Sequence, residues 1–252
     1  MKSDIFQNSE ATDTKAFTLQ NSKMLKVRVG LDGNAPEMFA RQGAMVAYQG
    51  QAQFDYQGAG GIKKMIKQKL SGEGVATMKV AGQAEVFFAD QASDVHLIEL
   101  EGDAVSINGR NVLAYSSGLD VDVHFVGGGG MAAGGLFNTI IQGHGMVAIT
   151  TKGTPVVLAT DAPTFVDSNA VVCWSANLQT QIASSFKMSN LIGRGSGEAL
   201  QIGFSGQGWV IVQPSEFDLA TMNQGGTNTS PGGAGAPAGG GLAGGLGGLL
   251  GR

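Results

Sequence analysis

Short segments in which apolar and polar residues alternate, or in which β-branched residues cluster, recur along most of this chain. The clearest of them are 24–29, 95–100, 119–125 and 179–182. A period of two is typical of a β-strand that has one face in a core. Helical periodicity is convincing only over 61–70, where isoleucine and methionine share one face and lysines the other. The pattern predicts an all-β protein, a sandwich or barrel, with one short helix.

Two short patterns occur three times each, in alternation along the chain. An apolar run that ends on an aromatic residue occurs at 45–48, 112–115 and 171–174. The second pattern occurs at 72–75, 133–136 and 197–200, and it is followed each time by a glycine that leads into an apolar strand, at Gly82, Gly143 and Gly206. Self-similarity at a near-constant spacing indicates a repeated structural unit. We therefore interpret the chain as three pseudo-repeated β-sandwich or barrel units, over about 40–100, 101–160 and 161–218.

This interpretation makes specific structural predictions. Each of the three glycines is expected to reverse the chain tightly between two strands at a positive φ. The aromatic residues Tyr48, Tyr115 and Trp174 are each expected to fill the space between sheets. One unit alone buries little of its surface, so the three are expected to share one interior about a pseudo-threefold axis.

Composition divides the chain into three parts. Residues 1–18 are predicted to form an N-terminal arm; it is acidic and has no apolar signal-peptide core, which predicts a cytoplasmic protein. Residues 19–223 are predicted to form the β domain. Residues 224–252 are rich in glycine and are predicted to form a flexible tail. Leucines at its end share one face at helical spacing and are a candidate adhesive patch: Leu242, Leu246, Leu249 and Leu250.

The charge balance and the cysteine count exclude several function classes. Sixteen Lys and Arg against twenty Asp and Glu give a net charge of −4, without the basic face that nucleic-acid binding requires. Cys173 is the single cysteine, so the chain has neither an internal disulfide nor a multi-cysteine zinc site. Alanine stands at the corresponding position of the other two repeats, which predicts that this thiol is buried and unreactive.

The three histidines are the remaining candidates for chemistry. Asp120, Asp122 and His124 share one face of a predicted strand, which makes them candidate metal ligands, with a polar surface as the alternative interpretation. His144 is replaced by glutamine in the other two repeats, which argues against a catalytic base. His96 is expected to point outward from its strand. We predict no catalytic residue and no cofactor.

The predicted helix over 61–70 carries a basic face. Its lysines are Lys63, Lys64, Lys67 and Lys69. Such a face can contact anionic lipid or an acidic partner. The alternative is a helix that covers one end of a sheet and leaves its lysines in water.

The order of these elements resembles the AIM24 family, which is described as having a tryptophan-attenuator-like (TRAP-like) β fold. The matching segments are 43–48, 70–75, 113–115, 171–174, 196–200 and 206–212. A Gly-Glu-Gly pattern is complete only in the first copy, because Gly134 replaces the Glu in the second and Ala199 the last Gly in the third. The two ends of the chain are more similar to actinobacterial members than to mitochondrial ones. The resemblance implies β-sandwich subdomains, oligomerisation and no established enzymatic activity; mitochondrial relatives are linked to inner-membrane organisation.

We therefore expect a non-catalytic scaffold or protein-interaction module. It is expected to be homo-oligomeric, with a trimer as one arrangement, because repeated sheets expose strand edges that need covering. Two alternatives stay open at this point. One is a peripheral membrane organiser that uses the lysine helix and the leucine-containing tail. The other is a small-ligand or metal-binding β protein that uses Asp120, Asp122 and His124.

Overall fold

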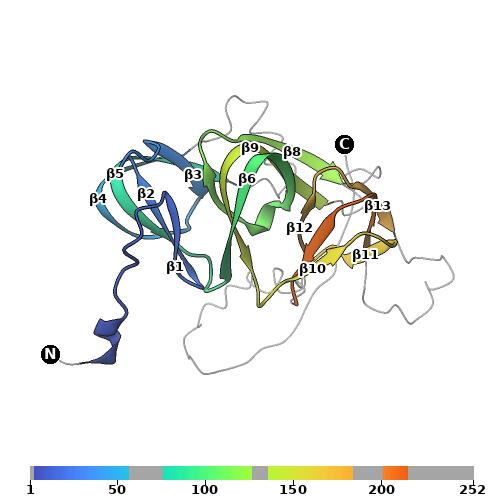
Figure 1. Cartoon of the computed structure of the whole chain (residues 1–252), viewed down its shortest axis with the longest axis horizontal. Helices are drawn as coiled ribbons and strands as arrows, with labels where there is room; N and C mark the ends of the chain where they lie inside the picture. The colour runs from blue at the N-terminus through green and yellow to red at the C-terminus, as the bar shows by residue number, and fades with distance from the viewer. Residues whose placement is uncertain (1–2, 57–75, 127–135, 184–200, 215–252) are drawn as a thin grey trace, which may run out of the picture. The chain divides into compact units, whose positions relative to one another are not determined.

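The computed structural model describes residues 3–56, 76–126, 136–183 and 201–214, and this part of the chain is almost entirely β (Figure 1). Its strands are β1 (Phe17–Asn21), β2 (Met24–Val29), β3 (Glu37–Arg41), β4 (Met45–Tyr56), β5 (Thr77–Phe88), β6 (Asp94–Asn108), β7 (Val112–Ser116), β8 (Asp120–Val126), β9 (Leu136–Thr151), β10 (Val156–Ala159), β11 (Thr164–Asp167), β12 (Val171–Ser175), β13 (Gln179–Ala183), β14 (Gln201–Ser205) and β15 (Trp209–Val212). Two short 3-10 helices, η1 (Asp4–Gln7) and η2 (Gly109–Asn111), complete the described elements. The all-β prediction is confirmed. The predicted helix over 61–70 and the tail over 224–252 lie outside the described residues.

The strands form antiparallel sheets, and most of the strands are labelled in Figure 1. The larger sheet runs β1-β2-β5-β3-β7-β9-β6-β12-β15-β10, with β4 added to β5 and β8 added to β9. The smaller sheet has the order β11-β14-β13. Segments 24–29, 95–100 and 179–182, predicted from alternation, lie inside β2, β6 and β13.

The three repeated glycines all have a positive φ, as predicted, but only one of them separates two strands. Gly82 (φ +124°) lies within β5 and Gly143 (φ +119°) lies within β9, whereas Gly206 (φ +112°) lies between β14 and β15. The expected tight reversals are therefore wrong. The glycine is instead the point where a strand changes its pairing partners: β5 pairs with β3 before Gly82 and with β2 after it. Strands that switch layers need such a bend.

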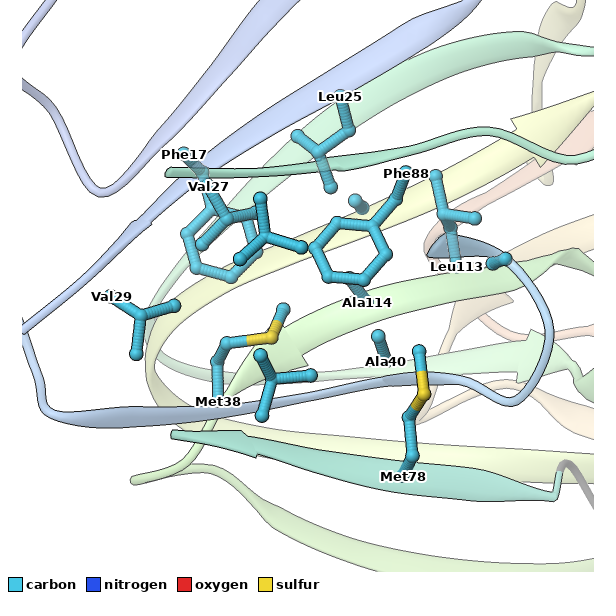
Figure 2. Close-up of a cluster of buried hydrophobic side chains, with 14 of the residues drawn as sticks. Phe17, Leu25, Val27, Val29, Met38, Ala40, Met78, Phe88, Leu113 and Ala114 are labelled. Atoms are coloured by element: carbon cyan, nitrogen blue, oxygen red, sulfur yellow. The ribbon is translucent and has the colours of Figure 1, made fainter. Parts of the chain in front are cut away.

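The core is divided among three clusters of buried side chains, which differs from the single shared interior expected from the sequence. The first lies mainly among β1–β5, the second contains side chains of β6, β7, β9 and β12, and the third contains side chains of β11, β12, β14 and β15. Figure 2 shows the first cluster, in which Val27 and Phe88 face Met38 and Met78. In each cluster, side chains from both sides of the repeated glycine pack together: Val80 and Val86 in the first, Ile141 and Val147 in the second, and Phe204 and Val210 in the third.

The strand pairs fall into three sets that share one register. We call residues 24–88, 94–151 and 156–212 sets 1, 2 and 3. In each set the aromatic residue of the repeated pattern is paired with a valine: Tyr48 with Val86, Tyr115 with Val147, and Trp174 with Val210. In each set the register also shifts at the same place, between the residues three and one positions before the aromatic residue. A bulge that recurs at one place is a designed feature of the strand pair.

Candidate functional site

The acidic and histidine residues predicted to share a strand face do lie together on β8, but only two of them are in contact. His124 Nε2 lies 3.1 Å from Asp122 Oδ2, and both side chains are exposed. Asp120 instead accepts a hydrogen bond from Gln142 Nε2, at 3.3 Å. Within the part of the chain that the structure describes, no group of three His, Cys, Asp or Glu residues is arranged to hold a metal ion.

The candidate membrane-contact residues lie outside the described residues. This applies to Lys63, Lys64, Lys67 and Lys69, and to the leucines of the tail. Among the helices that the structure describes, none is long and apolar enough to cross a membrane.

The other two histidines and the cysteine lie on strands, and their burial and neighbours are as follows. His96 Nε2 lies 2.9 Å from Thr151 Oγ1, and partial burial lowers the pKa of the imidazole despite the opposing effect of Asp94. His144 is exposed on β9, opposite Glu101 of β6. Cys173 is fully buried, and this burial raises the pKa of its thiol to about 12. The prediction of a buried thiol is confirmed.

Consecutive sets are joined by one kind of strand pairing, which occurs twice. In the first joint, β3 of set 1 pairs with β7 of set 2, with Phe39 opposite Tyr115. In the second joint, the end of β6 in set 2 pairs with β12 of set 3, with Ser106 opposite Trp174. Each joint thus places a strand from one set against the aromatic strand of the next. Tyr115 and Trp174 are 8% and 2% exposed as a result.

Side chains reinforce both joints in the same way. Arg41, the last residue of β3, directly follows the residues that pair with β7 and donates from Nε to the carbonyl oxygen of Val112 at 2.9 Å. Asn108 occupies the corresponding place in the second joint and donates from Nδ2 to the carbonyl oxygen of Val171 at 3.2 Å. Arg41 also pairs with Asp90 at 3.0 Å. Burial lowers the pKa of its guanidinium, with the Asp90 charge opposing this effect. The arginine is therefore engaged in holding strands together.

The first aromatic strand has no such neighbour among the described strands, and one expectation from the sequence is wrong as a result. Tyr48 on β4 was expected to be buried like its two counterparts, but its side chain is 49% exposed. Residues 46–50 of β4 are all exposed, whereas 112–115 of β7 and 171–175 of β12 are all buried. In the described part of the chain β4 pairs only with β5. The difference follows from the missing neighbour, because the register toward the valine strand is the same in all three sets.

Exposed apolar side chains occur on strands that, like β4, have a single partner among the described strands. The large hydrophobic residues that are exposed on the described strands are Leu19, Val46, Tyr48, Val123, Val156, Val157 and Phe165. They belong to β1, β4, β8, β10 and β11, and each of these strands has a single partner among the described strands. An unpaired strand edge exposes N–H and C=O groups that can pair with another chain. Together, the apolar side chains and the free backbone groups form a set of surfaces suited to protein contacts.

Comparison with known proteins places this architecture in a family. A family model described as Mitochondrial biogenesis AIM24 matches residues 17–215. The chain belongs to the AIM24 family. This AIM24-family chain is similar to the crystal structure of a protein from Streptococcus pyogenes, with a TM-score of 0.65 and 18% identity, over 83% of this chain and 95% of that chain. At that identity the likeness shows a shared fold. No curated protein sequence matches the chain.

Sequence reasoning did not identify the unpaired strand edges of this AIM24-family chain as its distinctive surface. The patterns 45–48, 112–115 and 171–174 are nearly interchangeable as sequences, yet only the first is exposed. One signal was available: no residue of 45–54 is charged, and an edge strand is usually protected by Lys or Pro.

Proposed function

We propose that this AIM24-family chain is a non-catalytic scaffold in the cytoplasm, built from three copies of one β unit, which assembles with itself and holds other proteins at its strand edges. One observation supports this function: on the described strands, large exposed apolar side chains occur only where a strand has a single partner among the described strands. The three-repeat organisation is supported by the register and bulge that sets 1, 2 and 3 share. The cytoplasmic location is supported by Cys173, a single buried thiol that needs no oxidising compartment.

The edge best suited to a foreign protein is β10, at the end of the larger sheet. Its Val156 and Val157 are neighbours in sequence, so they point to opposite faces of the sheet, and both are exposed. Only β15 pairs with β10 among the described strands. A partner strand added here would gain backbone hydrogen bonds and cover apolar side chains on both faces, which is the recognition mode called β-augmentation.

Affinity capture of the full chain from its own cells tests the scaffold function. The wild-type protein is compared with a Val156→Lys, Val157→Lys variant and with a control variant, Val123→Lys, which changes an exposed valine on β8. We expect defined proteins to co-purify with the wild type and with the control, and to fall at least about tenfold with the β10 variant, because two charges oppose strand addition. Equal recovery with all three proteins, or recovery of no protein above background, would contradict a scaffold that works through this edge.

A further inference from the structure

The two joints between consecutive sets have the same kind of strand pairing, and two strands of the same types do not take part in either joint. In each joint, a short strand from one set pairs antiparallel with the aromatic strand of the next set. The short strands are β3, the end of β6, and β11; the aromatic strands are β4, β7 and β12. The first joint uses β3 and β7, and the second uses β6 and β12. The short strand of set 3, β11, and the aromatic strand of set 1, β4, are therefore left over.

Equivalence of β11 with β3 and β6 rests on pairing within each set. In each set, the residue three positions before the repeated glycine pairs with a residue of the short strand. These pairs are Lys79 with Phe39 of β3, Ile140 with Ser106 of β6, and Gly203 with Phe165 of β11. Phe165 is thus the counterpart of Phe39, just as Tyr48 is the counterpart of Tyr115. In the first joint Phe39 and Tyr115 stack, with ring centroids 5.4 Å apart.

The leftover strands are exposed where their counterparts are covered. Phe165 is 55% exposed, and Tyr48 is close to half exposed. Within the described residues, β11 pairs only with β14 and β4 only with β5. Both strands therefore have one edge that no described strand covers, and an aromatic side chain stands on each. They are the counterparts, in sets 1 and 3, of strands that form the internal joints, and they do not pair with each other.

We propose that β11 of one copy pairs antiparallel with β4 of a second copy, in the register of the two internal joints, so that Phe165 lies opposite Tyr48. The same register places Thr164 opposite Gln49 and Val166 opposite Ala47. The contact is heterologous: each copy gives its β11 to one neighbour and its β4 to another. Such a contact produces a closed ring when its rotation closes, and a filament when it does not.

Chemistry along the two edges favours this occupant. The stretch 46–52 of β4 carries no charge, and β11 carries only Asp167 at its end, so strand addition meets no like-charge repulsion. An offset-stacked contact between Phe165 and Tyr48 would reproduce the aromatic contact of the first joint. The proposal deepens the self-assembling scaffold proposed above and rests on it, but it concerns the purified protein alone, without a foreign partner.

One position departs from the internal joints. Arg41 and Asn108 each donate a hydrogen bond to a carbonyl oxygen of the next strand, and their counterpart is Asp167. A carboxylate has no hydrogen to donate, so the contact between copies lacks this bond. It is therefore weaker than the internal joints, and Asp167→Asn supplies the missing donor. Because Asp167 Oδ1 accepts a bond from the backbone N–H of Asn169, which an amide oxygen also accepts, this variant keeps the local turn.

Disulfide trapping tests the register and the heterologous geometry together. Gln49→Cys and Thr164→Cys are made singly and together; directly opposed residues in an antiparallel pair have Cα atoms about 4.5–5.5 Å apart, within disulfide range. We expect no crosslink from either single variant, a single dimer when the two are mixed, and a ladder of multimers from the double variant. Homodimers of a single variant, a double variant that crosslinks only within one chain, or no crosslink in the mixture would each overturn the proposal. Wild type is the control, because Cys173 is buried.

Complementation tests the interface without any crosslink. By light scattering or sedimentation, Tyr48→Lys and Phe165→Lys are each expected to be monomeric where the wild type associates. Their mixture is expected to form a heterodimer and nothing larger, because each retains one intact half. A misfolded variant could not complement, so this result separates a lost surface from a lost fold.

Val157→Lys should associate like wild type, and Asp167→Asn at least several-fold more tightly. A wild-type protein that stays monomeric at high concentration contradicts the proposal. Binding of a foreign partner at β10 is tested separately, by the affinity capture described above.

Discussion

Lys26 Nζ lies 3.1 Å from Glu85 Oε1, and the lysine side chain is only 3% exposed. The ammonium group also donates to the carbonyl oxygen of Ala11 at 2.7 Å, which ties the N-terminal arm to β2. Glu85 in turn forms an ion pair with Arg28. Two cations therefore share one carboxylate between β2 and β5. Each has a second carboxylate nearby, Glu10 for Lys26 at 3.8 Å and Asp32 for Arg28, but Glu85 is the least exposed of the three acids.

The first prediction follows from this asymmetry. Glu85→Gln should lower the free energy of unfolding by about 3 kcal/mol, because it leaves the buried ammonium of Lys26 without its closest countercharge. Lys26→Met should cost less, about 1 kcal/mol, since Arg28 still neutralises Glu85 and the methionine keeps the apolar stem. Urea denaturation measures both.

A surface pair provides the control for this comparison. Glu37 lies 3.4 Å from Lys79 Nζ, and both side chains are substantially exposed. Glu37→Gln should change the free energy of unfolding by less than about 1 kcal/mol, as exposed ion pairs contribute little. If Glu85→Gln were as mild as Glu37→Gln, the shared carboxylate would not stabilise the fold as argued.

The second prediction concerns the three glycines of the repeated pattern. A Cβ at Gly82 would lie 2.2 Å from the backbone oxygen of Gln51, whereas at Gly143 and Gly206 the nearest atom is a leucine methyl at 3.5 Å and 3.4 Å. Gly143→Ala and Gly206→Ala should therefore cost about 1–2 kcal/mol of backbone strain. Gly82→Ala should cost clearly more, about 4 kcal/mol or above, because backbone must move. Equal losses at all three sites in thermal and urea unfolding would refute the close approach at Gly82.

The sequence predicts where the strands lie better than it predicts which strands pair with each other. Alternation depends on one buried face, so segments such as 24–29 were found with correct bounds. The glycines were recognised because a positive φ restricts residue type. Whether the chain reverses at a glycine depends on hydrogen bonds that continue beyond it, and the local pattern around Gly82 and Gly143 does not contain this information. Long-range pairing of this kind leaves no local pattern.

The same reasoning applies to the candidate site. Period two correctly placed Asp120, Asp122 and His124 on one strand, but it could not predict that Gln142 would bind Asp120. Tyr48 and Trp174 end nearly identical patterns, yet their exposure differs because only the second has a neighbouring strand from the preceding set. Exposure of an edge is a property of the assembled sheet, and the local sequence pattern does not encode it.

The third prediction is a pH dependence of stability that arises from His96. Burial lowers the pKa of its imidazole below the ordinary value of 6.5, with Asp94 opposing and Lys23 assisting the shift. The unfolded chain therefore binds a proton at a higher pH than the folded protein does. The resulting stability is fully present above pH 6.5 and is lost as pH falls from there toward the folded-state pKa. His96→Gln retains a partner for Thr151 and cannot titrate, so its unfolding midpoint should fall less than that of the wild type over this window. Parallel curves for the two proteins would exclude the contribution of His96.

The fourth prediction uses Cys173 as a reporter of opening at the joint between sets 2 and 3. Its thiol is buried on β12, opposite Ile107 of β6, and its pKa is raised to about 12. At pH 8 only about one part in ten thousand would be thiolate, and the thiolate is the reactive form. Labelling by a thiol reagent should thus be slow in the native protein and should follow the opening of this joint. Asn108→Ala removes the hydrogen bond to Val171 across the same joint, so it should speed labelling by about tenfold at roughly 1.4 kcal/mol of lost stability. Urea denaturation measures the stability of the variant. If its stability is reduced but its labelling rate is unchanged, Cys173 becomes accessible by a route other than separation of β6 from β12.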